Sequence, residues 1–115
     1  MKQTENAILD LTLEFAIAII IYCEKLEQTQ RYVISRQLLK SGTSVGANVR
    51  EAQSPESKAD FIHKMKIASK EAHETEYWLI LCQKSNGYPD CQNLLNQIQS
   101  ILKILSKIIS TSKRT

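Results

Sequence analysis

Glycine and proline are scarce in this chain of 115 residues, which contains three glycines and two prolines. Because these residues interrupt helices and strands, their scarcity favours a few long elements joined by few connections. With 43% hydrophobic residues, the chain has enough apolar material for one core, and we expect a single domain over residues 1–115. The sequence shows no strand-like alternation, internal repeat or low-complexity segment.

Long hydrophobic runs are also missing. The unbroken apolar run over residues 15–23 has nine residues, whereas a helix needs about 20 to cross a bilayer. The first residues include Glu5 and Asp10 and show no signal-peptide pattern. The three cysteines form no C-x-x-C pair, and Cys23 and Cys82 lie in apolar runs where a free thiol acts as a small hydrophobe. We therefore expect a soluble, cytoplasmic protein without membrane contact.

Acidic residues are missing from residues 91–115, which carry four basic side chains. Residues 31–70 are also basic, with eight basic and three acidic side chains, whereas residues 1–30 and 71–90 carry an excess of acid. The net charge of the whole chain is only +3. Such segregation is compatible with binding a polyanion, but ordinary solvated helix faces produce it too.

Apolar residues recur in steps of three and four along four segments, which is the spacing of one helical face. The segments predicted to be helical are approximately residues 5–26, 30–53, 57–85 and 91–110. Helices of this length with short connections fold most simply as a bundle. The predicted fold class is all-α, an antiparallel up-down-up-down four-helix bundle.

The short connections contain residues that are typical of helix ends. Thr29 is expected to cap the second helix, and either Ser54 or Ser57 the third. Asp90 is expected to cap the fourth helix. The tail over residues 111–115 is expected to fray.

The segment Ser41–Ala52 has the composition of a loop, yet the helical period continues through it. Gly42 and Gly46 each destabilise a helix by about 1 kcal/mol relative to alanine, which close packing against a neighbour would offset. A phosphate-binding loop is not indicated, because no strand precedes the segment and the G-x-x-x-x-G-K-[ST] spacing is missing. Asn48 falls on the core stripe, where a buried asparagine commonly sets register or oligomeric state. The segment is therefore predicted to be a closely packed helix.

The third helix contains a group of residues that could bind a metal ion. Asp60 and His63 have the i, i+3 spacing of di-iron bundles, but those sites need this spacing on two helices and two further glutamates. No nucleophile–base pair is evident from the spacing. We predict no metal, no cofactor and no enzymatic activity, and a metal-bearing bundle enzyme is the alternative. The other acidic and histidine side chains of this helix are expected to be exposed to solvent; they are Glu71, His73, Glu74 and Glu76.

Basic side chains are predicted on the outer faces of three helices. Such faces can contact phosphate groups by charge alone, without reading base sequence. The alternative is ordinary solubility charge, since the net charge is modest. The candidate nucleic-acid-binding residues are Arg36, Lys40, Arg50, Lys66, Lys70, Lys103 and Lys107.

The predicted helices carry more apolar surface than a simple seam needs. The first and last helices have wide apolar faces, and Val33 and Leu39 fall off the core stripe of the second. Excess apolar surface on a small bundle usually indicates self-association. A thick monomeric core is the alternative, and we expect a homo-oligomer.

Two blocks of the sequence resemble the signature of the bacterial four helix bundle protein family. One is QLLKSGTSVGANVREA over residues 37–52, and the other is S-x-x-D-F-I-x-K-x-x-I-A-x-K-E-A-x-E-T-x-Y-W-L over residues 57–79. The resemblance covers approximately residues 6–85. The last helix resembles that of the family only in its general character, without a specific motif. The signature positions are Ser41, Gly42, Ser44, Gly46, Asn48, Glu51, Glu71, Glu74 and Trp78.

That family is known from open reading frames within intervening sequences of large-subunit ribosomal RNA genes, and it includes the accessory protein of diversity-generating retroelements. The resemblance implies a bundle that assembles as a ring, with a homopentamer as the form known among relatives. The retroelement members bind nucleic acid and partner a reverse transcriptase through a basic surface. The expected function is a non-enzymatic, ring-forming bundle that binds RNA or DNA weakly. The alternative is an oligomeric protein–protein adaptor without a nucleic-acid role.

Overall fold

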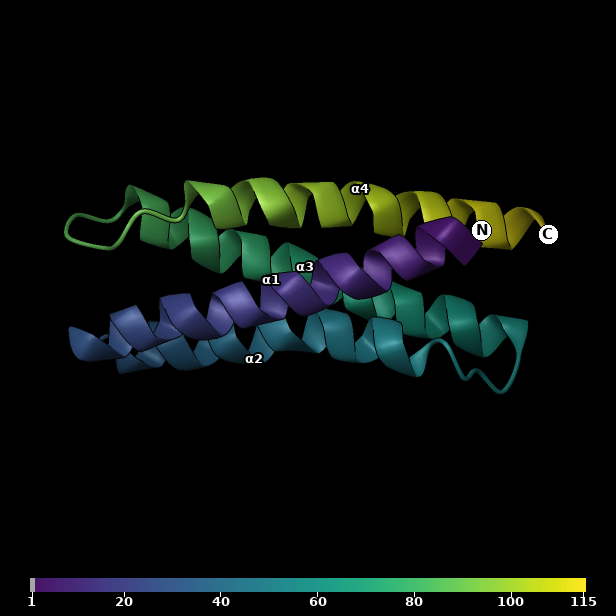
Figure 1. Cartoon of the computed structure of the whole chain (residues 1–115), viewed down its shortest axis with the longest axis horizontal. Helices are drawn as coiled ribbons and strands as arrows, with labels where there is room; N and C mark the ends of the chain where they lie inside the picture. The colour runs from purple at the N-terminus through teal and green to yellow at the C-terminus, as the bar shows by residue number, and fades with distance from the viewer. Residues whose placement is uncertain (1) are drawn as a thin grey trace.

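The computed structural model describes the backbone of residues 2–115 and the side chains of residues 7–115; Met1 and the side chain of Glu5 lie outside this part. The described chain folds into α1 (Lys2–Gln28), α2 (Tyr32–Glu51), α3 (Lys58–Lys84) and α4 (Gln92–Arg114), without strands. The helices run alternately up and down one long axis (Figure 1). α1 and α3 each contact both α2 and α4, so they occupy opposite corners of the bundle, as do α2 and α4. The predicted all-α up-down-up-down bundle is confirmed.

The core is built from the helical stripes that the sequence predicts. On α3 the buried residues are Met65, Ala68, Ala72, Thr75, Leu79 and Cys82. On α4 they are Leu94, Leu95, Ile98, Ile101, Leu105 and Ile108. Phe61, one turn before Met65, is only half-buried. Each large apolar side chain removed from water contributes about 1.5–3 kcal/mol to folding, so these stripes hold the four helices together.

The connection between α1 and α2 corrects the prediction that Thr29 caps the second helix. The N–H of Gln30 donates to the carbonyl of Glu27 at 3.0 Å, and the N–H of Arg31 donates to the carbonyl of Leu26 at 3.0 Å. These two bonds form the Schellman motif that ends α1, with Gln30 at φ 64° in the left-handed region. Thr29 therefore belongs to the end of α1, and its hydroxyl donates to Leu26.

The connection between α2 and α3 uses Ser57, one of the two predicted caps. The Oγ of Ser57 accepts a hydrogen bond from the N–H of Asp60 at 3.0 Å. The carboxylate of Asp60 in turn accepts from the N–H of Glu56 at 3.0 Å. This reciprocal pair satisfies two backbone donors at the start of α3, as a capping box does.

The connection between α3 and α4 does not use Asp90 as a cap, which corrects the prediction. Cys91 holds the cap position, and its N–H donates to the side chain of Gln83 at 2.7 Å. The other end of the same amide donates to the carboxylate of Asp90 at 2.6 Å. The predicted fraying of residues 111–115 is also wrong, because α4 continues to Arg114.

The segment Ser41–Ala52 is helical, and α2 approaches α1 closely along it. A Cβ at Gly42 would lie 2.9 Å from Cγ2 of the fully buried Ile19. A Cβ at Gly46, one turn later, would lie 3.3 Å from three atoms of Thr12. The prediction of a closely packed helix is confirmed, since only a residue without a side chain fits at Gly42 without displacing α1.

Asn48 does not have the buried, register-setting role predicted for it. It is half-buried, and its amide donates to the carbonyl of Ser44 in the preceding turn of its own helix. A buried polar contact between helices lies two turns earlier on the stripe. There the hydroxyls of Thr75 and Ser41 share a hydrogen bond, with their oxygens 2.9 Å apart, and both residues are at most 1% exposed.

Candidate nucleic-acid interface

All seven predicted nucleic-acid-binding residues are exposed, but the fold separates them into two groups. Arg36, Lys40 and Arg50 lie on the outer face of α2. The remaining four lie on α3 and α4, namely Lys66, Lys70, Lys103 and Lys107. Because α2 and α4 occupy opposite corners of the bundle, the cations of α4 are separated from those of α2. Of the cations on α3, Lys66 lies near Lys113 of α4, which is not among the seven.

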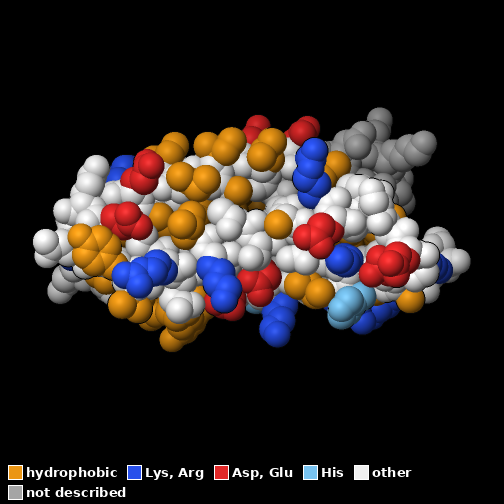
Figure 2. All heavy atoms as spheres, turned by 90° about the horizontal axis from the view of Figure 1, so that it is seen from below, with side chains coloured by type: hydrophobic (Ala, Val, Ile, Leu, Met, Phe, Trp, Pro, Cys, Tyr) orange, Lys and Arg blue, Asp and Glu red, His pale blue; other side chains and the backbone are white. Residues whose placement is uncertain are grey.

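The face on the α2 side carries charges of both signs. Figure 2, which views the bundle from this side, shows Lys and Arg side chains interspersed with Asp and Glu side chains. One such pair is Lys64 and Glu51, whose Nζ and Oε1 atoms are 3.0 Å apart. Nearby acids reduce the attraction of a surface for phosphate groups. The α2 group is therefore the weaker candidate.

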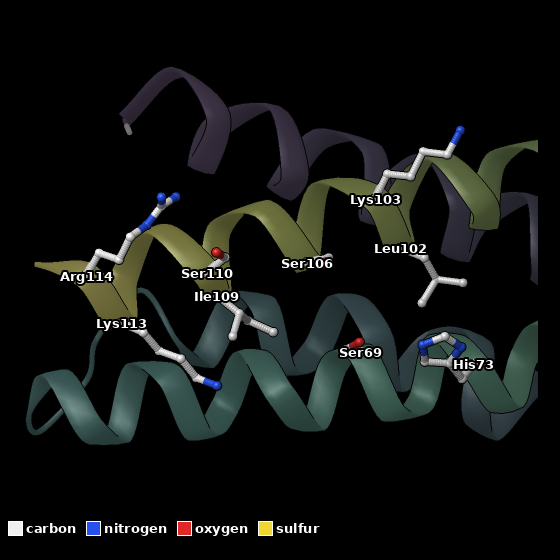
Figure 3. A pocket seen from close by; sticks show the side chains of 9 residues that line it. All are labelled: Ser69, His73, Leu102, Lys103, Ser106, Ile109, Ser110, Lys113 and Arg114. Carbon is white, nitrogen blue, oxygen red and sulfur yellow. The ribbon is translucent and has the colours of Figure 1, made fainter.

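An open groove of about 830 Å³ lies between α3 and α4, which we call the α3–α4 groove. It is lined by Ser69, His73, Leu102, Lys103, Ser106, Ile109, Ser110, Lys113 and Arg114. Figure 3 shows Lys113 reaching from α4 towards α3, whereas Lys103 and Arg114 extend from the opposite side of α4. The groove therefore has one lysine across its mouth and two cations along its outer rim.

The positive charge of this groove is reinforced from α3. The ammonium of Lys113 lowers the pKa of Lys66 from its ordinary value, first by charge repulsion. No acidic residue lines the groove, and Glu51–Lys64 is the single ion pair among the described residues. Lys66 and Lys113 thus form a cationic pair, suited to an anion that would relieve their repulsion.

The sequence prediction missed Lys113 and Arg114, which it assigned to a fraying tail. A signal was available, because Arg114 follows Lys103 and Lys107 at steps of four and seven residues on one helical face. Ser69, Ser106 and Ser110 left no comparable signal. A serine on a helix lines a groove only when a second helix packs beside it and forms the other wall.

The signature residues with acidic or aromatic side chains lie along α2 and α3 and make local structural contacts. Besides the ion pair of Glu51 with Lys64, the indole N–H of Trp78 donates to the carboxylate of Glu74 at 3.2 Å. The carbonyl of Glu71 accepts from the hydroxyl of Thr75 at 2.7 Å. These contacts stabilise helices, and none of them arranges groups for chemistry.

The residues considered for a metal site either make other contacts or lie apart from one another. Asp60 caps α3, and His63 is exposed. Within the described residues, no three His, Cys, Asp or Glu side chains lie close enough together to hold a metal ion.

Comparison with known proteins identifies the family. Residues 4–107 match the model of the 23S rRNA-intervening sequence protein family. The chain belongs to this family. A crystal structure of a protein of unknown function from Bacteroides thetaiotaomicron, assigned to the S23 ribosomal protein family, superposes with a TM-score of 0.87 at 44% sequence identity. The match covers 93% of this chain and 98% of that one. No curated protein matches the chain significantly.

This family member presents an apolar strip on the outer face of α1. Leu13, Ile17, Ile20 and Ile21 each leave 44–58% of their surface exposed. Asp10, Glu14 and Glu24 flank the strip and are exposed as well. None of the described helices combines the length and apolarity of a membrane span. The strip is therefore apolar surface that the chain by itself leaves in water.

Three free cysteines are buried near the end of the bundle that holds the α1–α2 and α3–α4 connections. Burial raises the pKa of the Cys23 and Cys91 thiols to about 11, and it also raises that of Cys82. Cys23 donates to the carbonyl of Ser35 at 3.4 Å, and Cys91 donates to that of Leu79 at 3.3 Å. These thiols therefore act as core residues and not as nucleophiles.

We expect the thiols to react about 100-fold more slowly in the folded protein than in denaturant at pH 8, because a pKa near 11 leaves little thiolate. Absorbance after addition of a disulfide reagent measures the rate, and the denatured protein should release three equivalents. Since the folded thiols hold their protons more tightly than the unfolded ones, their contribution to stability is full below about pH 9 and is lost as the pH rises towards 11. Rapid labelling of the native protein at pH 8 would contradict this assignment.

Proposed function

We propose that this protein is a non-enzymatic, ring-forming helical bundle of the cytoplasm that binds nucleic acid weakly through its basic outer faces. The observation that carries the proposal is the outer face of α4. Lys103, Lys107 and Arg114 follow one another along it, and α4 contains no acidic residue. Lys66 and Lys70 add positive charge on α3, where Lys66 lies near Lys113 of α4. The description of the family makes RNA the first nucleic acid to test.

Ring formation is supported by the strip on α1. Its apolar centre and acidic flanks complement a surface that is partly apolar and basic, and α2 offers one with Val33 beside Arg36 and Lys40. Val33 leaves 72% of its surface exposed. Contact between two different surfaces of successive copies is heterologous, and such contacts close into a ring when the rotation permits. We propose a homopentamer, which leaves the basic face of α4 free on each copy.

An oligomeric adaptor for another protein, such as a reverse transcriptase, is the second candidate. The observation that favours it is the same α1 strip, because an apolar surface with acidic flanks also suits a basic protein partner. On this alternative the cations of α3 and α4 serve solubility only. A pull-down that recovers protein but no nucleic acid would favour the adaptor.

Binding of the oligomer to a fluorescent 20-nucleotide RNA is expected to weaken about tenfold or more between 50 and 200 mM NaCl, because each phosphate contact releases counterions. Fluorescence anisotropy at each salt concentration measures this slope. Flat salt dependence, or no binding at the lowest salt, would refute the nucleic-acid role. The adaptor would then be the remaining function.

A further inference from the structure

The α3–α4 groove has the chemistry of a phosphate site at one end. Lys113 enters from α4, and Ser69 lies on α3 between Lys113 and His73 (Figure 3). Lys66 is close enough to Lys113 for each ammonium to experience the charge of the other. Leu102 and Ile109 are half-buried between the two helices and form an apolar floor. Together these groups surround a concave space with cations, hydroxyls and an apolar floor.

The hydroxyls that line this groove are available to a ligand. Elsewhere on the helices, Thr43, Ser44 and Ser85 donate to the carbonyl four residues earlier, at 2.6–2.7 Å. The groove serines are Ser69, Ser106 and Ser110. In the described chain, their hydroxyls make no hydrogen bond to protein. Each can therefore donate to a phosphate oxygen.

Flat rings continue the groove along α3, away from the end that holds Lys113 (Figure 3). His73 lines the groove on α3, and Tyr77 follows it one turn later with 56% of its surface exposed. The rings of Tyr77 and Trp78 form a T-shaped pair, with centroids 5.4 Å apart and an angle of 62°. That contact holds Tyr77 while leaving much of it in solvent. Exposed rings next to a basic groove suit unpaired bases, whose faces are free to stack.

We propose that the α3–α4 groove binds single-stranded nucleic acid, with a phosphate held by Lys66, Lys113 and the groove serines and a base stacked on His73 or Tyr77. This inference rests on the proposed function and specifies its site and strand type. A duplex is the poorer ligand, because its bases are already stacked and their faces are closed to the rings. Glu76, one turn beyond His73 on α3, limits the positive region at that end.

The experiment compares two double variants that remove the same charge. Lys66→Ala with Lys113→Ala removes the cationic pair at one end of the groove. Lys25→Ala with Lys84→Ala removes two exposed lysines near the opposite end of the bundle, which is 47 Å long. Anisotropy at low salt measures the Kd of each for a 20-nucleotide uridine strand and for a 20-base-pair RNA duplex. We expect the groove variant to bind the single strand at least tenfold more weakly than the control variant does.

A third variant, Tyr77→Ala, tests stacking without changing charge, and we expect it to weaken single-strand binding about fivefold or more. All the changed side chains are exposed, and circular dichroism checks that the helices persist. Equal losses in the two double variants would overturn the groove while leaving the proposed nucleic-acid role intact. Equal affinity of the wild-type protein for strand and duplex would overturn the strand preference. Absence of any binding by the wild type would refute the proposed function and the groove together.

Discussion

Replacing Gly42 with leucine is expected to destabilise the protein by about 3 kcal/mol or more. The Cβ alone would lie 2.9 Å from Cγ2 and 3.0 Å from Cγ1 of Ile19. Ile19 is fully buried and cannot swing into solvent, so α1 and α2 must separate. In a solvent-exposed helix the same change would stabilise, because leucine favours the helix more than glycine does. Thermal and urea unfolding, followed by circular dichroism, measure the change in free energy.

The control for this prediction is Ala47→Leu, at an exposed position of the same helix. It is expected to change stability by less than about 0.5 kcal/mol. A double-mutant cycle with Gly42→Ala and Ile19→Ala then tests the contact itself, since removing the two γ carbons of Ile19 should relieve part of the clash. A Gly42→Leu protein as stable as the wild type would show that α1 and α2 do not depend on this close approach.

Introducing two aspartates into the α1 strip, Ile17→Asp with Ile21→Asp, is expected to convert the proposed ring into single chains of 13.1 kDa. Each side chain is 52% exposed in the single chain, so the change removes little from its own core. In a ring these positions would be covered, and two charges without partners there would oppose association strongly. Light scattering at micromolar concentration measures the mass, and circular dichroism confirms that the helices remain.

Asn93→Asp with Gln99→Asp adds the same charge at exposed positions of α4 and serves as the matched control. It should retain the mass of the wild type, which we propose to be that of five chains. A wild-type protein that is monomeric at micromolar concentration would refute the ring. A variant that remains oligomeric would place the interface away from the α1 strip.

The sequence predicts much of the fold because helical periodicity is local. The stripes of α3 and α4 were readable from residues three and four apart, and the same stripes are buried in the bundle. The helix caps are harder to predict from the sequence than the stripes are. Ser57 acts as predicted, but Thr29 and Asp90 do not. Thr29 lies in the turn that ends α1, where Gln30 is left-handed, and the side chain of Gln83 accepts from the N–H of Cys91 at the start of α4. Several local solutions compete at a helix end, and the surrounding chain decides among them.

The candidate site was only partly predictable. Exposure of the seven basic residues follows from their positions opposite the core stripes. Which basic residues lie close together does not follow from those positions. Lys66 and Lys113 are far apart in sequence and approach each other only when α3 and α4 pack antiparallel. The role of Ser41 was likewise hidden, since its partner Thr75 lies 34 residues away. Asn48, which seemed the better polar core residue, bonds within its own helix.

By itself, then, the sequence determined that the chain forms four amphipathic helices, that Ser41–Ala52 continues one of them, and that basic residues lie on outer faces. These properties depend on spacings within one helix. The tertiary structure decided that Ile19 occupies the space left by Gly42, that the single chain leaves the α1 strip uncovered, and that Lys66 of α3 lies near Lys113 of α4. These depend on which helices are neighbours, and neighbours are chosen by shape and burial across the whole core.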